Sequence, residues 1–251
     1  ALARVDQRAG EILATVFEEA QIGRATGAGD EPAGRGEVRA EIVRVGASLF
    51  QRGYVHSTAG NISVRLNAEE GGGFLITPTD ACLGFLDAGQ LAWVADNGEQ
   101  LAGARASKTL QLHRRIYATA PDARCVLHTH STHLVALTLQ GAWRDDDILP
   151  PITPYQVMKV GHVPLIPYGV PGSPAVADAV AATITRAERP LRAVMLERLG
   201  PTVWHNSPAS AMALLEELEE TARLWLLSER RPTPLGEEQI NDLRAQFNAP
   251  W

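Results

Sequence analysis

The sequence of 251 residues has few cysteines and no long apolar run. Its two cysteines, Cys82 and Cys125, lie far apart and outside any C-x-x-C pair, so a disulfide scaffold is not indicated and a reducing compartment fits better. No stretch approaches the roughly 20 apolar residues that span a bilayer. The N-terminus also lacks the charged-then-apolar pattern of a signal peptide. We therefore expect a cytoplasmic protein without a membrane partner.

An excess of positive charge is missing as well. The chain has 23 Lys and Arg residues against 29 Asp and Glu residues, which gives a net charge of -6. A protein that binds nucleic acid needs a basic face, so we expect no nucleic-acid partner. The apolar content of 45% and the charged content of 21% are ordinary for a globular protein, and the length suffices for one large domain.

Composition divides the chain into three parts. Residues 1–35 combine a helical pattern with a segment rich in Gly, Ala and charge, which predicts an N-terminal helix and a mobile linker. Residues 36–230 form the main domain, and residues 231–251 are a C-terminal tail or helix. Within the main domain, strand and helix patterns are mixed without strict β–α–β alternation. This mixture predicts an α/β protein with a central mixed sheet and helices on its faces.

Periodicity and capping signals place the individual elements. Helices are predicted at 36–53, 107–120, 132–139 and 175–186, with a longest helix that starts after Ser207-Pro208. Strands are predicted at 62–66, 74–77, 125–127, 163–166, 193–196 and 202–204.

Two histidines follow a short apolar strand, Cys125-Val126-Leu127. Side chains alternate along a strand, so His128 and His130 are expected to point the same way. Two imidazoles side by side are half of a metal site. An isolated His-x-His is more often two polar residues at the end of a strand, but the flanking sequence here favours a metal.

Three short polar segments could bind an anion. Asn61 follows Gly60, which permits close approach of the backbone to a ligand, and Thr79 lies in a hydroxyl-rich turn. Ser107 and Lys108 come at a predicted helix start, where free N–H groups favour phosphate or carboxylate. Each segment alone is also typical of an ordinary turn or helix cap.

Other polar residues are expected to be structural. His113 lies on a half-apolar helix face and is predicted to be a hydrogen-bonded core histidine rather than a ligand. His133 could bind a metal but more often such a residue is structural. The acidic residues of the last long helix are expected to form its solvated face; they are Glu216, Glu217, Glu219 and Glu220.

Taken together, these segments resemble the class II aldolase/adducin family over about residues 36–227. The resemblance rests on the motifs Thr58-Ala59-Gly60-Asn61-Ile62-Ser63, Leu75-Ile76-Thr77-Pro78-Thr79, Ser107-Lys108, His113, Pro121-Asp122 and His128-Thr129-His130-Ser131. The stretches 83–87, 150–155, 160–161 and 164–168 are similar to the branch that decarboxylates 3-oxo-tetronate 4-phosphates.

The resemblance implies a three-layer α/β/α sandwich with a central mixed, largely antiparallel sheet. It also implies a homotetramer with active sites between subunits and a small anionic substrate. A divalent metal on three histidines would polarise a substrate carbonyl and stabilise an enediolate. Zinc is the first expectation, iron and manganese are alternatives, and the site could also lack a metal. His128 and His130 match two metal ligands. The positions that match phosphate- or acid-binding residues are Asn61, Thr79, Ser107 and Lys108.

The chain departs from the family at the proton shuttle. Where the family has Ser-Lys-Glu, this chain has Ser107-Lys108-Thr109. A threonine hydroxyl titrates far above neutral pH, so Thr109 occupies the catalytic position without being able to act as the general base. Tyr155 is a second catalytic candidate, on a looser match.

A second departure removes a metal ligand. Where the family has Asn-His-Gly, this chain has Arg198-Leu199-Gly200, and Leu199 cannot bind a metal. Glu197 would share the face of Leu199 on a strand and is the best substitute ligand, ahead of His133 and His205. Two histidines and a carboxylate would suit iron as well as zinc.

These features leave three functional hypotheses. The first is a divergent enzyme that cleaves a C–C bond of a small oxo- or hydroxy-acid by decarboxylation or retro-aldol reaction. The second is a non-haem iron oxygenase on the same fold. The third is a non-catalytic, adducin-like protein that has lost its metal.

Overall fold

The structure is a computed structural model, and it describes residues 33–251. Most of the expected N-terminal helix and linker lies outside the described residues. Residues 33–35 begin helix α2 (Ala33–Gln51), so this helix starts three residues before the predicted position. The extension brings the Arg35 guanidinium over the ring of Trp93, 3.8 Å from its centre. Within residues 33–251, no helix combines the length and apolar character needed to cross a bilayer.

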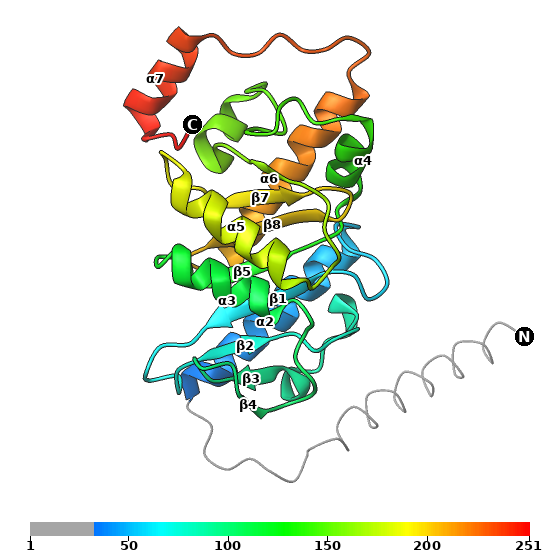
Figure 1. The fold of residues 1–251 in the computed structure, drawn as a ribbon, viewed down its shortest axis with the longest axis vertical. Helices are drawn as coiled ribbons and strands as arrows, with labels where there is room; N and C mark the ends of the chain where they lie inside the picture. The colour runs from blue at the N-terminus through cyan, green and yellow to red at the C-terminus, as the bar shows by residue number, and fades with distance from the viewer. Residues whose placement is uncertain (1–32) are drawn as a thin grey trace, which may run out of the picture. The chain divides into compact units, whose positions relative to one another are not determined.

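A sheet of eight strands lies at the centre of the described chain, in the order β4-β3-β2-β1-β5-β8-β7-β6 (Figure 1). The strands are β1 (Asn61–Arg65), β2 (Phe74–Ile76), β3 (Ala92–Val94), β4 (Gln100–Ala102), β5 (Cys125–His128), β6 (Leu165–Ile166), β7 (Ala193–Leu196) and β8 (Gly200–His205). Neighbouring strands are antiparallel except for the parallel pair β6 and β7. The predicted mixed, largely antiparallel sheet is confirmed.

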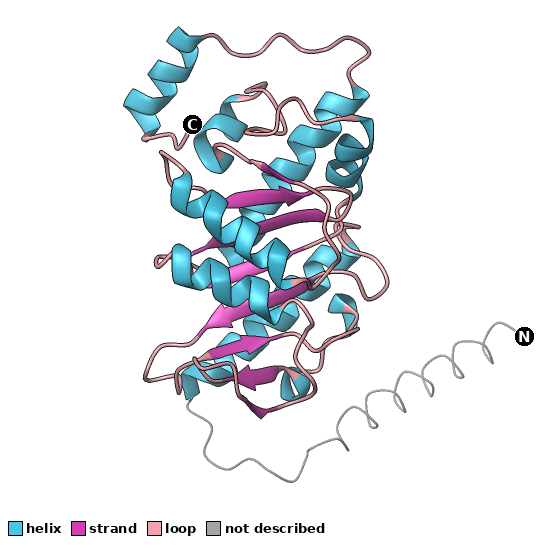
Figure 2. Ribbon diagram, in the orientation of Figure 1, coloured by secondary structure: helices cyan, strands magenta, loops and turns pink. Residues whose placement is uncertain are grey.

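Helices cover both faces of this sheet (Figure 2). One face carries α3 (Leu110–Thr119) and α5 (Pro174–Arg186), and the other carries α2, α4 (Thr132–Gln140) and α6 (Pro208–Leu227). Strand alternation sends alternate side chains into the two cores. In β5, Val126 packs under α3 and α5, whereas Cys125 and Leu127 pack on the opposite side. The three-layer α/β/α sandwich is therefore confirmed.

The elements that the sequence patterns missed are short or exposed. Strand β4 is exposed at all three positions, so it shows no alternation of polar and apolar residues. The segment after Tyr155 forms a short π-helical turn, η3 (Gln156–Val160), and two 3₁₀ turns, η1 (Leu83–Phe85) and η2 (Ala88–Gln90), precede β3. Near the C-terminus, α7 (Glu237–Phe247) packs Ile240 against Val157 and Trp251.

Two glycines enclose the peptide groups at the end of β5. Gly60 has a φ of +87°, and a Cβ there would lie 2.8 Å from the carbonyl oxygen of His128. Gly200 has a φ of +143°, and a Cβ there would lie 2.0 Å from the carbonyl oxygen of Thr129. Only glycine permits both this backbone conformation and this approach. The two glycines therefore let the starts of β1 and β8 pack directly against the backbone of His128 and Thr129.

We expect Gly200→Ala to lower the free energy of unfolding by more than about 3 kcal/mol, because backbone strain and a steric clash add. The midpoint of urea denaturation measures the change. The control is Gly36→Ala in α2, where a Cβ would meet nothing within 4 Å and the stability should rise by up to about 1 kcal/mol. Equal stabilities for the two variants would contradict the inferred close packing.

Candidate active site

His128 ends β5 with its ring held by β8. Its Nδ1 lies 2.9 Å from the carbonyl oxygen of Pro201 and 3.0 Å from the hydroxyl oxygen of Thr202. A carbonyl can only accept, so Nδ1 carries the hydrogen and Nε2 keeps its lone pair. Burial, with a smaller effect of the neighbouring His130, lowers the pKa of His128 to about 3. The side chain is therefore a neutral imidazole with its lone pair on Nε2.

His130 lies beside His128, as the alternation along the strand predicts. The two ring centres are 5.1 Å apart and the rings are tilted by 72°. Burial is the larger cause that lowers the pKa of His130, and His56 adds to it. Two neutral imidazoles are thus brought together at the end of β5.

The sequence predicted Glu197 as the substitute third metal ligand. The structure does not place Glu197 in a metal site. The chain turns after Leu196, with Arg198 in the left-handed region at a φ of 61°, so Glu197 is not on a strand. Its Oε2 instead accepts the backbone N–H of Tyr168 at 2.9 Å. Among residues 33–251, no group of three His, Cys, Asp or Glu side chains lies close enough to hold a metal ion.

The other two substitute ligands are also placed elsewhere. His133 Nδ1 lies 2.8 Å from Glu219 Oε1, at the start of α4. His205 pairs with Cys125 at the opposite end of β5 from His128. The third ligand position therefore stays without a metal-binding side chain in the part of the chain that the structure describes.

His128 lines a small cavity between α3, α5 and the β7–β8 turn. The cavity walls include Lys108, Thr109, Glu197 and Leu199, together with several residues of the loop 167–173. About 30 Å³ is open to the centres of water molecules, which is room for about two waters but less than a pocket that encloses a metabolite. A substrate would have to bind across the mouth of this cavity.

The predicted anion-binding residues are carried by loops that pair with one another. Ile62, next to Asn61, exchanges hydrogen bonds with Thr77 at 3.0 and 3.2 Å. The backbone N–H of Ser107 donates to the carbonyl oxygen of Thr77 at 3.2 Å, and that of Thr79 donates to Arg105 at 2.9 Å. The start of β1, the turn after β2 and the segment before α3 therefore form one continuous surface.

The segment before α3 differs slightly from the prediction. The helix begins at Leu110 rather than near Ser107. Ser107 is nearly buried, and its Oγ lies 2.9 Å from the hydroxyl of Thr109. Lys108 is exposed and its Nζ lies 3.7 Å from Asp80 Oδ2. An exposed pair at this distance is weak, so the Lys108 ammonium can still attract an anion.

Tyr155 does not reach the cavity within this chain. It precedes η3 and its side chain is 60% exposed. Its predicted catalytic role therefore has no support from the geometry of a single chain.

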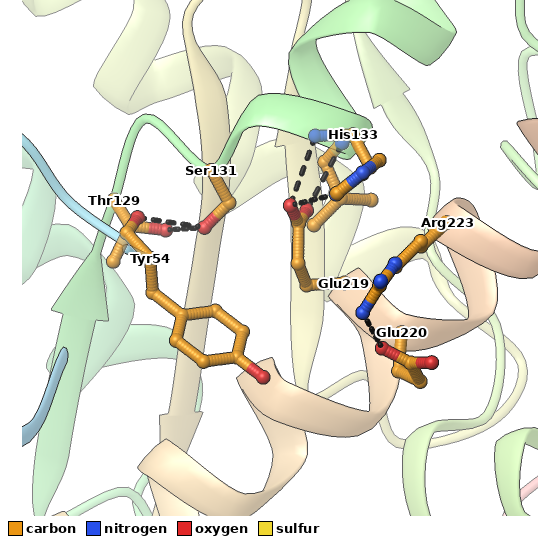
Figure 3. A network of polar contacts seen from close by, with 8 residues as sticks. Tyr54, Thr129, Ser131, His133, Glu219, Glu220 and Arg223 are labelled. Carbon is orange, nitrogen blue, oxygen red and sulfur yellow. Dashed lines mark hydrogen bonds and ion pairs between the residues drawn. The ribbon is translucent and has the colours of Figure 1, made fainter. Parts of the chain in front are cut away.

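A buried carboxylate, that of Glu219, fixes the start of α4 (Figure 3). Glu219 of α6 accepts the backbone N–H groups of His133 at 2.9 Å and Leu134 at 3.0 Å. The expectation that Glu219 belongs to a solvated face is wrong, because only 7% of this residue is exposed. Its carboxylate satisfies helix N–H groups that have no partner within α4.

The turn between His128 and α4 is held on its other side by hydroxyl groups. The Ser131 hydroxyl donates to the carbonyl oxygen of Tyr54 at 3.1 Å, and Thr129 Oγ1 lies 2.7 Å from Ser131 Oγ. All three residues are drawn in Figure 3. The position of His130 therefore depends on contacts with both the segment after α2 and helix α6.

The comparison with protein families agrees with this geometry. Residues 40–226 match the model of the class II aldolase and adducin N-terminal domain. The chain belongs to this family.

Several relatives are enzymes. The 3-oxo-tetronate 4-phosphate decarboxylase of Cupriavidus necator is 53% identical over 220 residues, which cover 86% of this chain and 98% of that protein. The enzyme of the same name from Escherichia coli K12 is 38% identical over 209 residues, with 83% and 95% covered. This chain is an enzyme of the lyase class, as predicted.

Solved structures show the same fold. YgbL from Escherichia coli, proposed to be an aldolase, epimerase or decarboxylase, has a TM-score of 0.77 and 39% identity, with 84% of this chain and 99% of that chain covered. An L-fuculose 1-phosphate aldolase has a TM-score of 0.72 at 22% identity, with 84% and 96% covered, and supports the fold alone.

We expect Glu219→Ala to lower the free energy of unfolding by about 2–4 kcal/mol, because it leaves helix N–H groups and His133 without their acceptor. Chemical denaturation followed by circular dichroism measures the loss. The matched control is Glu220→Ala, which removes only an exposed pair with Arg223 at 3.5 Å and should cost less than about 0.5 kcal/mol. Similar losses for both variants would count against a buried cap.

Proposed function

We propose that this enzyme decarboxylates a 3-oxo acid that carries a phosphate group, of the 3-oxo-tetronate 4-phosphate type. The relatives with this name align over nearly their whole length. The observation that carries the proposal is that Thr109 lines the His128 cavity at the position where the family pattern has a glutamate.

Retro-aldol cleavage and decarboxylation differ in whether they need a general base. A retro-aldol cleavage must remove a proton from a substrate hydroxyl as the C–C bond breaks, so it needs a base. A 3-oxo acid loses CO₂ from a carboxylate that is already ionised, so no proton has to be removed. The Thr109 hydroxyl cannot serve as that base. The remaining carboxylate of the cavity, Glu197, accepts the N–H of Tyr168 with Oε2 and lies 3.7 Å from the Arg198 guanidinium with Oε1. The residues present therefore favour decarboxylation.

The proposed step balances without an added reactant. The bond between C1 and C2 breaks, CO₂ leaves, and the electron pair moves into the C2–C3 bond and onto the C3 oxygen as an enediolate. A proton from water then reaches C2 and gives a ketone phosphate. Hydrogen-bond donors stabilise the negative charge while it moves. Asn61, Ser107 and Lys108 are the donors that this chain offers.

A divalent metal does not fit the described residues as a complete site. Family membership implies such a metal, which supplies Lewis-acid polarisation of a carbonyl when bound. His128 and His130 are the residues that would hold it, but catalytic sites normally use three protein ligands and Leu199 supplies none. The choice among zinc, iron and manganese stays a prediction.

The remaining hypotheses receive less support. An iron site of two histidines and one carboxylate would need Glu197 beside the histidine pair, and among residues 33–251 no such group of three side chains is present. The non-catalytic reading does not fit relatives that are named as enzymes. The homotetramer and the cytoplasmic location stay predictions. Exposed aromatic side chains such as Phe85, Tyr155 and Tyr168 are surfaces that a subunit contact could cover.

We expect the full chain to release one CO₂ per ketone phosphate from 3-oxo-tetronate 4-phosphate. Thr109→Val should keep kcat within about threefold, because no proton passes through this hydroxyl. A coupled assay for CO₂ and ketone phosphate measures both. Ser107→Ala is the comparison variant and should raise KM, because it removes a donor to the anion. Retro-aldol cleavage without CO₂ release, or no turnover with and without Zn²⁺, Fe²⁺ or Mn²⁺, would overturn the proposal.

Leu199→His should bind zinc at least about tenfold more tightly than the natural chain, because it adds an imidazole to the wall that His128 lines. Calorimetric titration with Zn²⁺ measures the change, independently of activity. The control is Leu199→His combined with His128→Ala, which should lose the gain. Unchanged affinity would show that the residue at position 199 is too far from the two histidines.

A further inference from the structure

A buried chain of four polar side chains links β1 to α3. Asn61 and Ser63 lie two residues apart on the strand, and His113 and Tyr117 lie four residues apart on the helix, so each pair shares one face. His113 Nε2 is 2.6 Å from Asn61 Oδ1, and its Nδ1 is 2.7 Å from Ser63 Oγ. Ser63 Oγ is also 2.7 Å from the Tyr117 hydroxyl. All four side chains are buried, and the prediction of a hydrogen-bonded core histidine at 113 is confirmed.

The placement of the Asn61 amide oxygen sets the direction of these hydrogen bonds. An amide oxygen only accepts, so His113 donates from Nε2. Burial lowers the pKa of His113 to about 3, so the ring is neutral and carries one N–H. Nδ1 then accepts from Ser63, and Ser63 in turn accepts from Tyr117 at 2.7 Å, a shorter contact than the 3.3 Å from the Tyr117 hydroxyl to the carbonyl oxygen of Arg124. Each hydrogen is used once, and the Asn61 amide is held in one of its two orientations.

The free end of the Asn61 amide remains available to a ligand. With Oδ1 held by His113, the Nδ2 group points away from that ring. Nδ2 makes no hydrogen bond to the described residues, yet it is not among the buried side-chain atoms that lack a partner, so solvent reaches it. Asn61 is also directly opposite His128 in the antiparallel pair of β1 and β5. Opposed residues project from the same face, so this donor lies beside His128.

We propose that His113 is a positioning residue: through Ser63 and Tyr117 it is held in the orientation that turns the Asn61 N–H donor toward an anionic oxygen of the substrate. The inference rests on the proposed function, since it takes Asn61 as a substrate contact. The opposite orientation would present the Asn61 carbonyl oxygen, which repels an anion. A fixed His113 thus decides whether Asn61 attracts or repels the substrate.

The experiment compares His113→Met with His113→Gln in the full chain. Glutamine keeps an N–H donor toward Asn61 Oδ1, and methionine does not. Binding of inorganic phosphate by calorimetry is measured together with kcat and KM for 3-oxo-tetronate 4-phosphate. Met should weaken phosphate binding or lower kcat by about 10- to 100-fold, the effect of losing a hydrogen bond to a charged group, and Gln should recover most of the loss.

The pattern of the loss identifies the oxygen. Weaker phosphate binding and raised KM with constant kcat would assign Asn61 to the phosphate group. Lower kcat with unchanged phosphate binding would assign it to the carboxylate or enediolate oxygen. Either pattern supports the proposal. Folded Met and Gln variants that both match the natural chain in binding and kcat would overturn it, because a purely structural hydrogen-bond chain changes stability alone.

A spectroscopic readout separates this inference from the proposed function. Nitrogen-15 NMR of the full chain should show His113 as the neutral Nε2–H tautomer. In Ser63→Ala, which removes the donor to Nδ1, the Nδ1–H tautomer should also be populated. Observation of Nδ1–H in the natural chain would overturn the proposal even if decarboxylation occurs. If no decarboxylation is found but the tautomer and the phosphate effects are as expected, the proposed function fails and the positioning role stands.

Discussion

The contact of Gly60 and Gly200 with the His128–Thr129 backbone is the constraint on which the rest of the site depends. A side chain at either glycine would meet a backbone carbonyl oxygen at 2.8 or 2.0 Å, so the close approach of β1 and β8 exists only without one. This approach puts Asn61 and Thr202 on either side of His128 in the sheet. Pairing with β8 thereby fixes the tautomer of His128, and pairing with β1 places the Asn61 amide donor on its other side.

The cavity beside His128 has an apolar wall that suits the proposed chemistry. Leu112, Val176, Leu196 and Leu199 all line it. A carboxylate loses its charge when it leaves as CO₂, so a wall that hydrates it poorly raises the ground state relative to the transition state. Leu199 is part of this apolar wall and contributes no metal-binding atom beside His128.

The fold could be predicted from the sequence because its helices and inner strands have clear periods, whereas side-chain partners from distant segments could not. Strand β4 is exposed at every position and gave no signal. Glu219 looked like part of a solvated acidic face, since sequence does not show that the start of α4 packs against it. Glu197 was expected on a strand, but the left-handed residue Arg198 ends that strand. The spacing of Ser63, His113 and Tyr117 could have indicated their network.

The two departures from the family pattern are one change of the site rather than two separate losses. Thr109 and Leu199 line the same cavity as His128, so both departures fall in one site. The polar groups around them are hydrogen-bonded: His128 Nδ1 bonds to the carbonyl oxygen of Pro201, and the Asn61 amide bonds to His113. Burying such groups costs free energy unless every hydrogen bond is made, and apolar side chains would fill the same space without that cost. A scaffold without chemistry gains nothing from this arrangement, so the arrangement agrees with relatives that are named as enzymes.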